Sequence, residues 1–333
     1  MGTAEDQIAN LIADVGLDDE EPEFDVTTVD AETENLNVAR CAIRKLDGFD
    51  RFKNITVLCL RYNLLEKIEG LDSLTSLVEL DISYNNIKKI EGLDKLTNLK
   101  ELDLAQNHIE KIEGLDSLTN LRSLFLMSNK VAKIEGLDSL VKLDRLDLSS
   151  NQIAAIENLN NNVALEFLYL NDNQLSKIEN LDNLKKLIIL NLVENSITEI
   201  SGLEQLHELQ GLYLGQNRIQ KIDGLNANTK LEVLDLNVNK LSAINNVDHL
   251  VYLTDFWAKG NNLTNFDDLD QLADLMCLSC VYLEMNPWAD DPDYWSIVIE
   301  KLPQIERLDD ETILPLSSNE AAGDGTAEMV EVA

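Results

Sequence analysis

The sequence predicts an α/β solenoid, in which short repeats stack into a curved parallel β-sheet on the concave face and short 3₁₀ or helical turns on the convex face. Three observations predict this fold class. An asparagine recurs every 22 residues, without a slip, from Asn63 to Asn261. Leucines stand at fixed positions before each of these asparagines. The chain is 44% hydrophobic, too much for a disordered polypeptide.

The repeat has the form Leu-x-x-Leu-x-Leu-x-x-Asn-x-Leu, which is the leucine-rich repeat pattern. One copy consists of Leu99, Leu102, Leu104, Asn107 and Ile109. A copy upstream of the regular series has Cys41 in the asparagine position, and a last copy reaches Asn286 after 25 residues instead of 22. The sequence therefore predicts about 12 repeats, none of which can bury its own apolar face outside the stack.

Each repeat position has a physical reason. The Leu-x-Leu pair alternates as a strand does, so that both leucines point inward. The asparagine offers a donor and an acceptor to backbone groups where the chain leaves the strand, and unpaired buried polar groups are costly. We therefore expect a buried asparagine ladder beside a parallel sheet.

The second half of each repeat has apolar residues at steps of three, as in Ile112, Leu115, Leu118 and Leu121. This spacing suits 3₁₀-like turns. One position between them holds residue types that tolerate positive φ, which predicts one left-handed corner per repeat. The residues at this position are Gly48, Gly70, Gly92, Gly114, Gly136, Asn158, Asn180, Gly202, Gly224, Asn246 and Asp268.

The two ends of the chain differ from the repeats. Residues 1–35 are predicted to be a flexible acidic extension, in which Ile8, Leu11, Ile12 and Val15 have the spacing of a short helix. The repeats span 36–291, and a C-terminal cap spans 292–310, with a capping helix around 292–302 stopped by Pro303. Residues 311–333 are predicted to be an acidic flexible tail.

Charge excludes several classes of partner. The chain has 61 Asp and Glu against 27 Lys and Arg, a net charge of −34. Nucleic acids and anionic membrane surfaces attract basic proteins, so neither is expected as a partner. No apolar run approaches the roughly 18 residues of a membrane span, and no signal peptide pattern is visible. Four cysteines do not indicate a disulfide scaffold, which favours a reducing compartment.

The non-leucine strand positions, which are expected to face the concave side, hold acids and large aromatics. Acids gather early, at Glu79, Asp81, Glu101 and Asp103, and return at Asp235 and Asp255. Large aromatics on an exposed face are typical of a protein-binding surface. The alternatives are that the rings stack on one another over the leucines and that the acids form a solvated face. The aromatics assigned to this face are Tyr62, Tyr84, Phe125, Phe167, Tyr169, Tyr213, Trp257 and Tyr282.

No catalytic motif is present. The chain lacks a phosphate-binding loop, a Gly-x-Ser-x-Gly elbow and a His-Glu-x-x-His helix. Cys277-x-x-Cys280 is the one metal-like or redox-like motif, but Cys41 and Cys59 lie at the other end of the repeats, too far to complete a zinc site. The expectation is a protein with no catalytic residue, no metal and no cofactor.

The repeat and its exposed ladder together resemble one subclass, the protein phosphatase 1 regulatory subunit 7 (sds-twenty-two type) leucine-rich repeat family. The resemblance covers about residues 36–309, and the strings Phe256-Trp257 and Val281 to Pro287 are particularly similar. It implies that Asp103, Phe125, Asp235, Trp257 and Tyr282 match the family's partner-binding residues in type. Asp147, Tyr169 and Asp255 match conservatively. Together with the exposed Tyr213, these form the expected partner-binding set. Trp295 and Ser296 depart from the family, where basic residues are more usual.

The resemblance implies a non-enzymatic regulatory subunit that binds the catalytic subunit of protein phosphatase 1 on its concave face and controls its activity, maturation or localisation. It also implies a nuclear and cytoplasmic location, and we expect a monomer before complex formation. Two alternatives stay open: a leucine-rich repeat scaffold or assembly factor with a different protein client, and an acidic chaperone for basic proteins.

Overall fold

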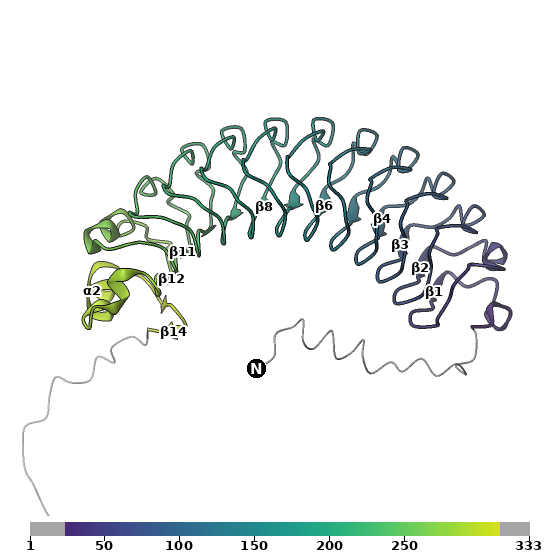
Figure 1. Cartoon of the computed structure of the whole chain (residues 1–333), viewed down its shortest axis with the longest axis horizontal. Coiled ribbons are helices and arrows are strands. Elements are labelled where there is room, and N and C mark those ends of the chain that lie inside the picture. Colours follow the sequence, from purple (N-terminus) through teal and green to yellow (C-terminus); the bar gives the residue numbers. More distant parts are fainter. Residues whose placement is uncertain (1–23, 314–333) are drawn as a thin grey trace, which may run out of the picture. The chain divides into compact units, whose positions relative to one another are not determined.

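A computed structural model describes residues 24–313 of the 333-residue chain. The chain divides into two compact units, Met1–Leu190 and Asn191–Ala333, called here the N-terminal and C-terminal units. Both are solenoids of short strands joined by turns (Figure 1). The predicted short helix around Ile8 to Val15 lies outside the described residues.

The N-terminal unit contains seven parallel strands that pair in sequence order, in register, each separated from the next by 22 residues. Two 3₁₀ helices, η1 (Val26–Thr28) and η2 (Phe49–Arg51), flank its first strand. The strands are β1 (Asn35–Asn37), β2 (Val57–Cys59), β3 (Glu79–Asp81), β4 (Glu101–Asp103), β5 (Ser123–Phe125), β6 (Arg145–Asp147) and β7 (Phe167–Tyr169). The strand β8 (Ile189–Asn191) contains the boundary between the units.

The C-terminal unit continues the same pattern with β9 (Gly211–Tyr213), β10 (Val233–Asp235), β11 (Asp255–Trp257) and β12 (Cys280–Tyr282), all parallel. A two-residue strand β13 (Arg307–Leu308) pairs parallel to β12, and β14 (Glu311–Thr312) pairs antiparallel to β13. Its helical elements are η3 (Phe266–Gln271), η4 (Pro287–Asp290) and the α-helix α2 (Tyr294–Lys301). The predicted fold class is therefore confirmed.

The core of each unit is a column of leucines and isoleucines. In the repeat around β4, Leu102 and Leu104 have no exposed surface, and Leu99, Ile109 and Ile112 are buried with them. Burying one such side chain is worth roughly 1.5–3 kcal/mol. The middle residue of every strand from β1 to β12 points into this core, which leaves the first and third residues of most strands at the surface.

The asparagine ladder forms as predicted. Nδ2 of Asn107 donates to the carbonyls of Ile82, at 3.1 Å, and Leu104, at 3.0 Å, while its Oδ1 accepts from the N–H of Ile87 at 3.0 Å. One side chain thus joins two consecutive repeats and satisfies backbone groups that no strand pairing reaches. Asn217 makes the equivalent contacts in the C-terminal unit.

The predicted left-handed corner occurs at every glycine and asparagine proposed for it, with φ between 55° and 80°. Asp268 is the exception and that prediction is wrong, because this residue lies inside η3 and not in a corner.

A second left-handed position, not predicted, immediately precedes the ladder asparagine. It holds residues of every chemical type, including Tyr62 (φ 57°) and the β-branched Val238 (φ 53°).

The turns are of the predicted 3₁₀ type, but most are single turns and not helices. Between strands the chain closes isolated turns, such as Leu74 N–H to Leu71 O and Leu77 N–H to Leu74 O, and 3₁₀ helices of three or more residues occur only at η1 to η4 among the described residues. Two turn leucines are replaced by buried asparagines that the pattern did not predict. In the N-terminal unit, Nδ2 of Asn162 donates to the carbonyls of Leu137 and Leu140. In the C-terminal unit, Nδ2 of Asn228 donates to the carbonyls of Leu203 and Leu206.

The cap helix is confirmed as α2, Tyr294–Lys301. Beyond the ladder, Asp309 directly follows β13. Its Oδ1 accepts from the N–H groups of Leu283 and Glu284, and its Oδ2 accepts from the hydroxyl of Tyr294 at 2.9 Å. All three partners donate, so a carboxylate suits this end of the stack better than an amide does. Burial is the main cause that raises the pKa of Tyr294, and the negative charge of Asp309 raises it further.

Some residues assigned to the flanking extensions are structured. Residues 24–34 include η1, and Phe24 packs against Phe49 with ring centroids 6.2 Å apart. At the other end, Glu311–Thr312 forms β14. The remainder of the predicted extension and tail, residues 1–23 and 314–333, lies outside the described residues.

Candidate binding face

The candidate site is the row of first and third residues of the strands, called here the strand face. In each unit these strands line the inner side of the curve (Figure 1). All nine predicted partner-binding residues occupy strand ends on this face: Asp103, Phe125, Asp147 and Tyr169 in the N-terminal unit, and Tyr213, Asp235, Asp255, Trp257 and Tyr282 in the C-terminal unit.

In the N-terminal unit the four predicted residues form one continuous row. Parallel register places Asp103 beside Phe125, Phe125 beside Asp147, and Asp147 beside Tyr169. All four side chains are half-buried. Since neighbouring strands lie about 4.8 Å apart, acids and rings alternate at contact distance along this row.

Asp103 is held by its own backbone and crowded by other acids. Its Oδ1 accepts from the N–H of Ala105 at 2.9 Å. The pKa of Asp103 is raised to about 6, chiefly by burial. The charges of Asp81 and Glu101 add to this shift, and the Ala105 hydrogen bond and Arg61 oppose it. Asp103 is therefore a carboxylate whose ionised form is destabilised until a cation approaches it.

The C-terminal unit concentrates aromatic rings instead. Trp257 is the centre, with ring centroids 6.3 Å from Tyr213 and 5.9 Å from Tyr282. Its indole Nε1 is buried and has no hydrogen-bond partner among the described residues. Half-buried rings with an unsatisfied donor are typical of interface anchors.

Asp235 lies on the strand between two of these rings and is only 7% exposed. By register it stands between Tyr213 and Trp257. Its Oδ1 accepts from the N–H of Asn237 at 2.9 Å, and burial raises its pKa to about 6.

Gly215 leaves space for the Asp235 carboxylate because it has no side chain. A Cβ at that position would lie 2.9 Å from Asp235 Oδ2, too close for an alanine to be accommodated without a shift. A larger residue at 215 would therefore displace the Asp235 side chain.

Asp255 occupies the first position of β11 and pairs in register with Cys280. Its Oδ2 accepts from the hydroxyl of Thr254 at 2.7 Å. Asp255 is half-buried and lies at the opposite end of β11 from Trp257.

The hydrogen bonds that the strand aspartates accept from the serines two residues further on were not predicted from the sequence. In the N-terminal unit, Oδ1 of Asp81 accepts from the N–H and the hydroxyl of Ser83, and Asp147 makes the same pair of contacts with Ser149. The Asp-x-Ser spacing could have indicated these turns, because aspartate commonly accepts from the N–H two residues on. Each of these carboxylates therefore has one oxygen committed to the fold.

Two further features of the face were missed. Lys259 and Glu284 form an ion pair beside the C-terminal rings. Tyr62 and Tyr84, assigned to the face from sequence, lie three residues beyond the ends of β2 and β3, at left-handed positions.

Nothing in the described residues forms a metal or redox centre. No group of three or more His, Cys, Asp or Glu residues could hold a metal ion within residues 24–313. Cys277 is exposed while Cys280 is buried, and both are free thiols. Burial raises the pKa of Cys280, which keeps that thiol protonated and unreactive. Over the same range, no helix has the length and apolar character needed to cross a bilayer.

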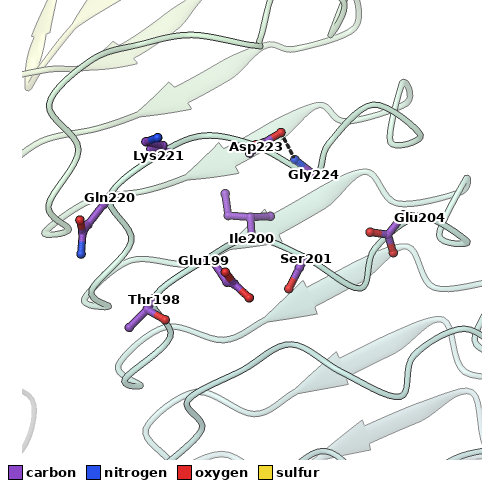
Figure 2. Close-up of a pocket in the computed structure, with 9 residues that line it drawn as sticks. All are labelled: Thr198, Glu199, Ile200, Ser201, Glu204, Gln220, Lys221, Asp223 and Gly224. Atoms are coloured by element: carbon purple, nitrogen blue, oxygen red, sulfur yellow. Dashed lines mark hydrogen bonds between the residues drawn. The ribbon is translucent and has the colours of Figure 1, made fainter.

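A recess of about 610 Å³ lies between two repeats of the C-terminal unit, on the turns and not on the strand face (Figure 2). Charges of both signs surround it, from Glu199, Glu204, Asp223 and Lys221, and Asp223 Oδ1 accepts from Gly224 N–H at 2.9 Å. Its nine lining residues include no histidine and no cysteine. This lining offers neither a nucleophile with a base nor a set of metal ligands.

Family models place the chain among known proteins. Residues 75–117, 119–161 and 163–205 match the model of leucine-rich repeats in two copies, and residues 206–324 match a second leucine-rich repeat model. The chain belongs to the leucine-rich repeat family. No curated protein matches the sequence.

Solved structures agree with the fold. An internalin, InlF, from Listeria monocytogenes is 27% identical, with a TM-score of 0.68 over 84% of this chain and 87% of that one. A leucine-rich repeat protein from Leptospira interrogans is 21% identical, with a TM-score of 0.67 over 81% and 82% of the two chains. The functional domain of InlJ from Listeria monocytogenes is 20% identical, with a TM-score of 0.67 over 83% of this chain and 62% of that one.

Proposed function

We propose that the protein is a non-enzymatic regulatory subunit that binds the catalytic subunit of protein phosphatase 1 with the strand faces of its two units. The leucine-rich repeat scaffold is a protein-binding architecture, which supports the general class. The particular partner rests on the ladder of side chains, whose order of acids and aromatics resembles that of the phosphatase-binding family.

One observation carries the proposal: the buried carboxylate of Asp235 stands by register between Tyr213 and Trp257, and Tyr282 extends the row of rings on the other side of Trp257. A face built only for solubility would not expose three large rings and bury an acid between them. An apolar partner surface carrying Lys or Arg would cover the rings and neutralise the carboxylate at once. Asp103, Asp147 and Asp255 would receive further basic residues of the phosphatase.

Binding would control the activity, maturation or localisation of the catalytic subunit, in the nucleus and the cytoplasm. The protein would be a monomer before it forms this complex. Neither nucleic acid nor a membrane is part of the proposal, because the net charge of −34 repels both.

The experiment is a calorimetric titration of the purified phosphatase catalytic subunit into the full chain and into the double variant Asp103→Ala, Trp257→Ala. The proposal expects measurable binding that the double variant loses by at least tenfold. Arg122→Ala is the matched control, because Arg122 pairs with Asp144 away from the strand face. Full binding by the double variant would refute this site.

The salt dependence of binding distinguishes the proposed function from the alternative of an acidic chaperone for basic proteins. A purely electrostatic complex dissociates in high salt, whereas an interface anchored by aromatic rings persists. A leucine-rich repeat scaffold with another client would show no phosphatase binding at any salt concentration.

A further inference from the structure

A cluster of arginines and tyrosines at the start of the N-terminal unit lies outside the proposed phosphatase contacts. Arg40, Tyr62 and Tyr84 occupy the same position in three consecutive repeats, immediately before the ladder residue. The guanidinium of Arg40 lies 4.8 Å from the centroid of the Tyr62 ring, and the Tyr62 and Tyr84 rings stack at 4.2 Å. Arg61 joins them, 5.0 Å from the Tyr62 centroid and 4.7 Å from the Tyr84 centroid.

The backbone holds these side chains in place. Arg40, Tyr62 and Tyr84 all have left-handed φ, between 54° and 60°, a conformation that bulky residues rarely adopt. Each N–H at these positions donates to the next repeat: Arg40 to Arg61 O, Tyr62 to Ser83 O and Tyr84 to Ala105 O. The strand pairing thus imposes the conformation, and the stack is organised before any ligand arrives.

Neither arginine forms a contact ion pair among the described residues, although the charges of Asp81 and Asp103 lie close enough to Arg61 to interact with it. Among the described residues, Arg122 forms an ion pair, whereas neither Arg40 nor Arg61 does, and the buried Nε of Arg61 has no hydrogen-bond partner. Asp81, on the neighbouring strand, accepts from Ser83 and from the thiol of Cys59. Arg40 is exposed, and Arg61 is half-buried.

We propose that this cluster binds an acidic peptide segment of a partner protein. The guanidinium of Arg40 lies over the Tyr62 ring and is exposed, and a guanidinium in this position can present its N–H edge to a carboxylate in a bidentate manner. Arg61 hydrogen-bonds to Tyr62 and Tyr84 and adds positive charge beside it. Two guanidiniums on one aromatic stack match two carboxylates on nearby side chains of an extended peptide, and the tyrosine rings supply apolar contact for what lies between them. The site is a cationic spot on a chain with a net charge of −34, so it selects the sign of charge that the rest of the protein repels.

Fluorescence anisotropy tests the proposal with the full chain and a fluorescein-labelled peptide, Gly-Glu-Asp-Leu-Glu-Asp-Gly. The acidic peptide is expected to bind, and the same peptide with Gln and Asn in place of Glu and Asp is expected not to bind. The double variant Arg40→Ala, Arg61→Ala should weaken binding at least tenfold. Arg145→Ala is the matched control, because Arg145 also lies on a ring, 4.6 Å from Phe167, but belongs to β6 and is not part of the cluster of Arg40, Arg61, Tyr62 and Tyr84. No binding by the natural chain, or equal binding by the double variant, overturns the proposal.

A single charge reversal separates recognition from structural support. Arg40→Glu changes an exposed side chain, so the fold is retained and circular dichroism should be unchanged. It should abolish binding of the acidic peptide, and Arg61→Lys, which keeps the charge but loses the planar edge, should weaken it several-fold. If both variants bind as the natural chain does, the cluster only supports the first repeats and the proposal fails.

Discussion

The strand faces of the two units are built on the same backbone and differ in what they display. The N-terminal unit alternates acids and rings along a row, with Asp103, Phe125, Asp147 and Tyr169 each half-buried. The C-terminal unit brings Tyr213, Trp257 and Tyr282 into ring contact, and the acid that stands between the first two by register, Asp235, is 7% exposed. Behind both faces the asparagine ladder makes the same hydrogen bonds.

Two aspartates make the contrast sharper. Asp103 and Asp235 both have a pKa raised to about 6, and in both burial is the main cause. Around Asp103 other charges also act, from Asp81, Arg61 and Glu101, whereas no charged side chain contributes to the shift of Asp235. The first is a crowded electrostatic site, and the second is a carboxylate isolated among rings.

This difference teaches where function lies in a repeat protein. Positions that face the core are set by the stack and recur with few changes, such as the buried asparagines Asn162 and Asn228. Positions that face the solvent are free of that demand, so they differ between units and can be specialised for a partner.

The largest expected effect is on stability, through the asparagine ladder that both units share. Asn107→Leu in the N-terminal unit and Asn217→Leu in the C-terminal unit should each cost about 3 kcal/mol of unfolding free energy. Each substitution leaves buried carbonyls and an N–H without partners. Guanidinium chloride denaturation followed by circular dichroism measures this. The exposed neighbour, in the variant His108→Ala, should change stability by less than about 0.5 kcal/mol. A loss below about 1 kcal/mol at either asparagine would contradict the common ladder.

The second effect concerns the two aspartates. A folded pKa near 6 exceeds the unfolded value of 3.8, so the folded state binds more protons between about pH 4 and pH 6 and stability falls as the pH rises through that window. Asp235→Asn keeps an oxygen for the Asn237 N–H and removes the buried charge. It should therefore stabilise the protein by about 1–2 kcal/mol at pH 7.5 and change little at pH 3.5. Denaturation curves at the two pH values measure the difference, and an Asp235→Asn gain that is equal at both would contradict the burial of the charge.

The smallest effect distinguishes the two sites. In 0.5 M NaCl the stabilisation by Asp103→Asn at pH 7.5 should change by a few tenths of a kcal/mol, because Asp81, Arg61 and Glu101 act on it through charge. The gain from Asp235→Asn should not change, because burial alone raises that pKa. If both respond to salt alike, the two faces do not differ in the way described.

Much of this fold could be predicted from sequence, because one chemical requirement repeats at a fixed interval. The ladder asparagine must be asparagine to serve carbonyls and an N–H together, so Asn107 and its equivalents mark the register. The capping helix α2 could also be predicted, since Pro303 lies just beyond its end and cannot continue a helix.

Features fixed by the backbone and not by residue type could not be predicted. The left-handed position before the asparagine accepts Tyr62 and even Val238, because the N–H of Val238 donates to Lys259 O and holds the conformation in place. No residue preference marks such a position. Similarly, the ring contacts of Trp257 follow from strand register, which brings together residues 44 or 25 positions away in the chain.

If the ladder folds the protein and the strand face binds its partner, the variant Trp257→Ala should stay folded and bind the phosphatase catalytic subunit less tightly. Its affinity is measured by calorimetric titration at 25 °C in 0.15 M salt, with the natural chain in parallel. The expected result is a loss of about 2–4 kcal/mol of binding free energy in a folded variant. Unchanged affinity in a folded Trp257→Ala variant would contradict binding through the strand face.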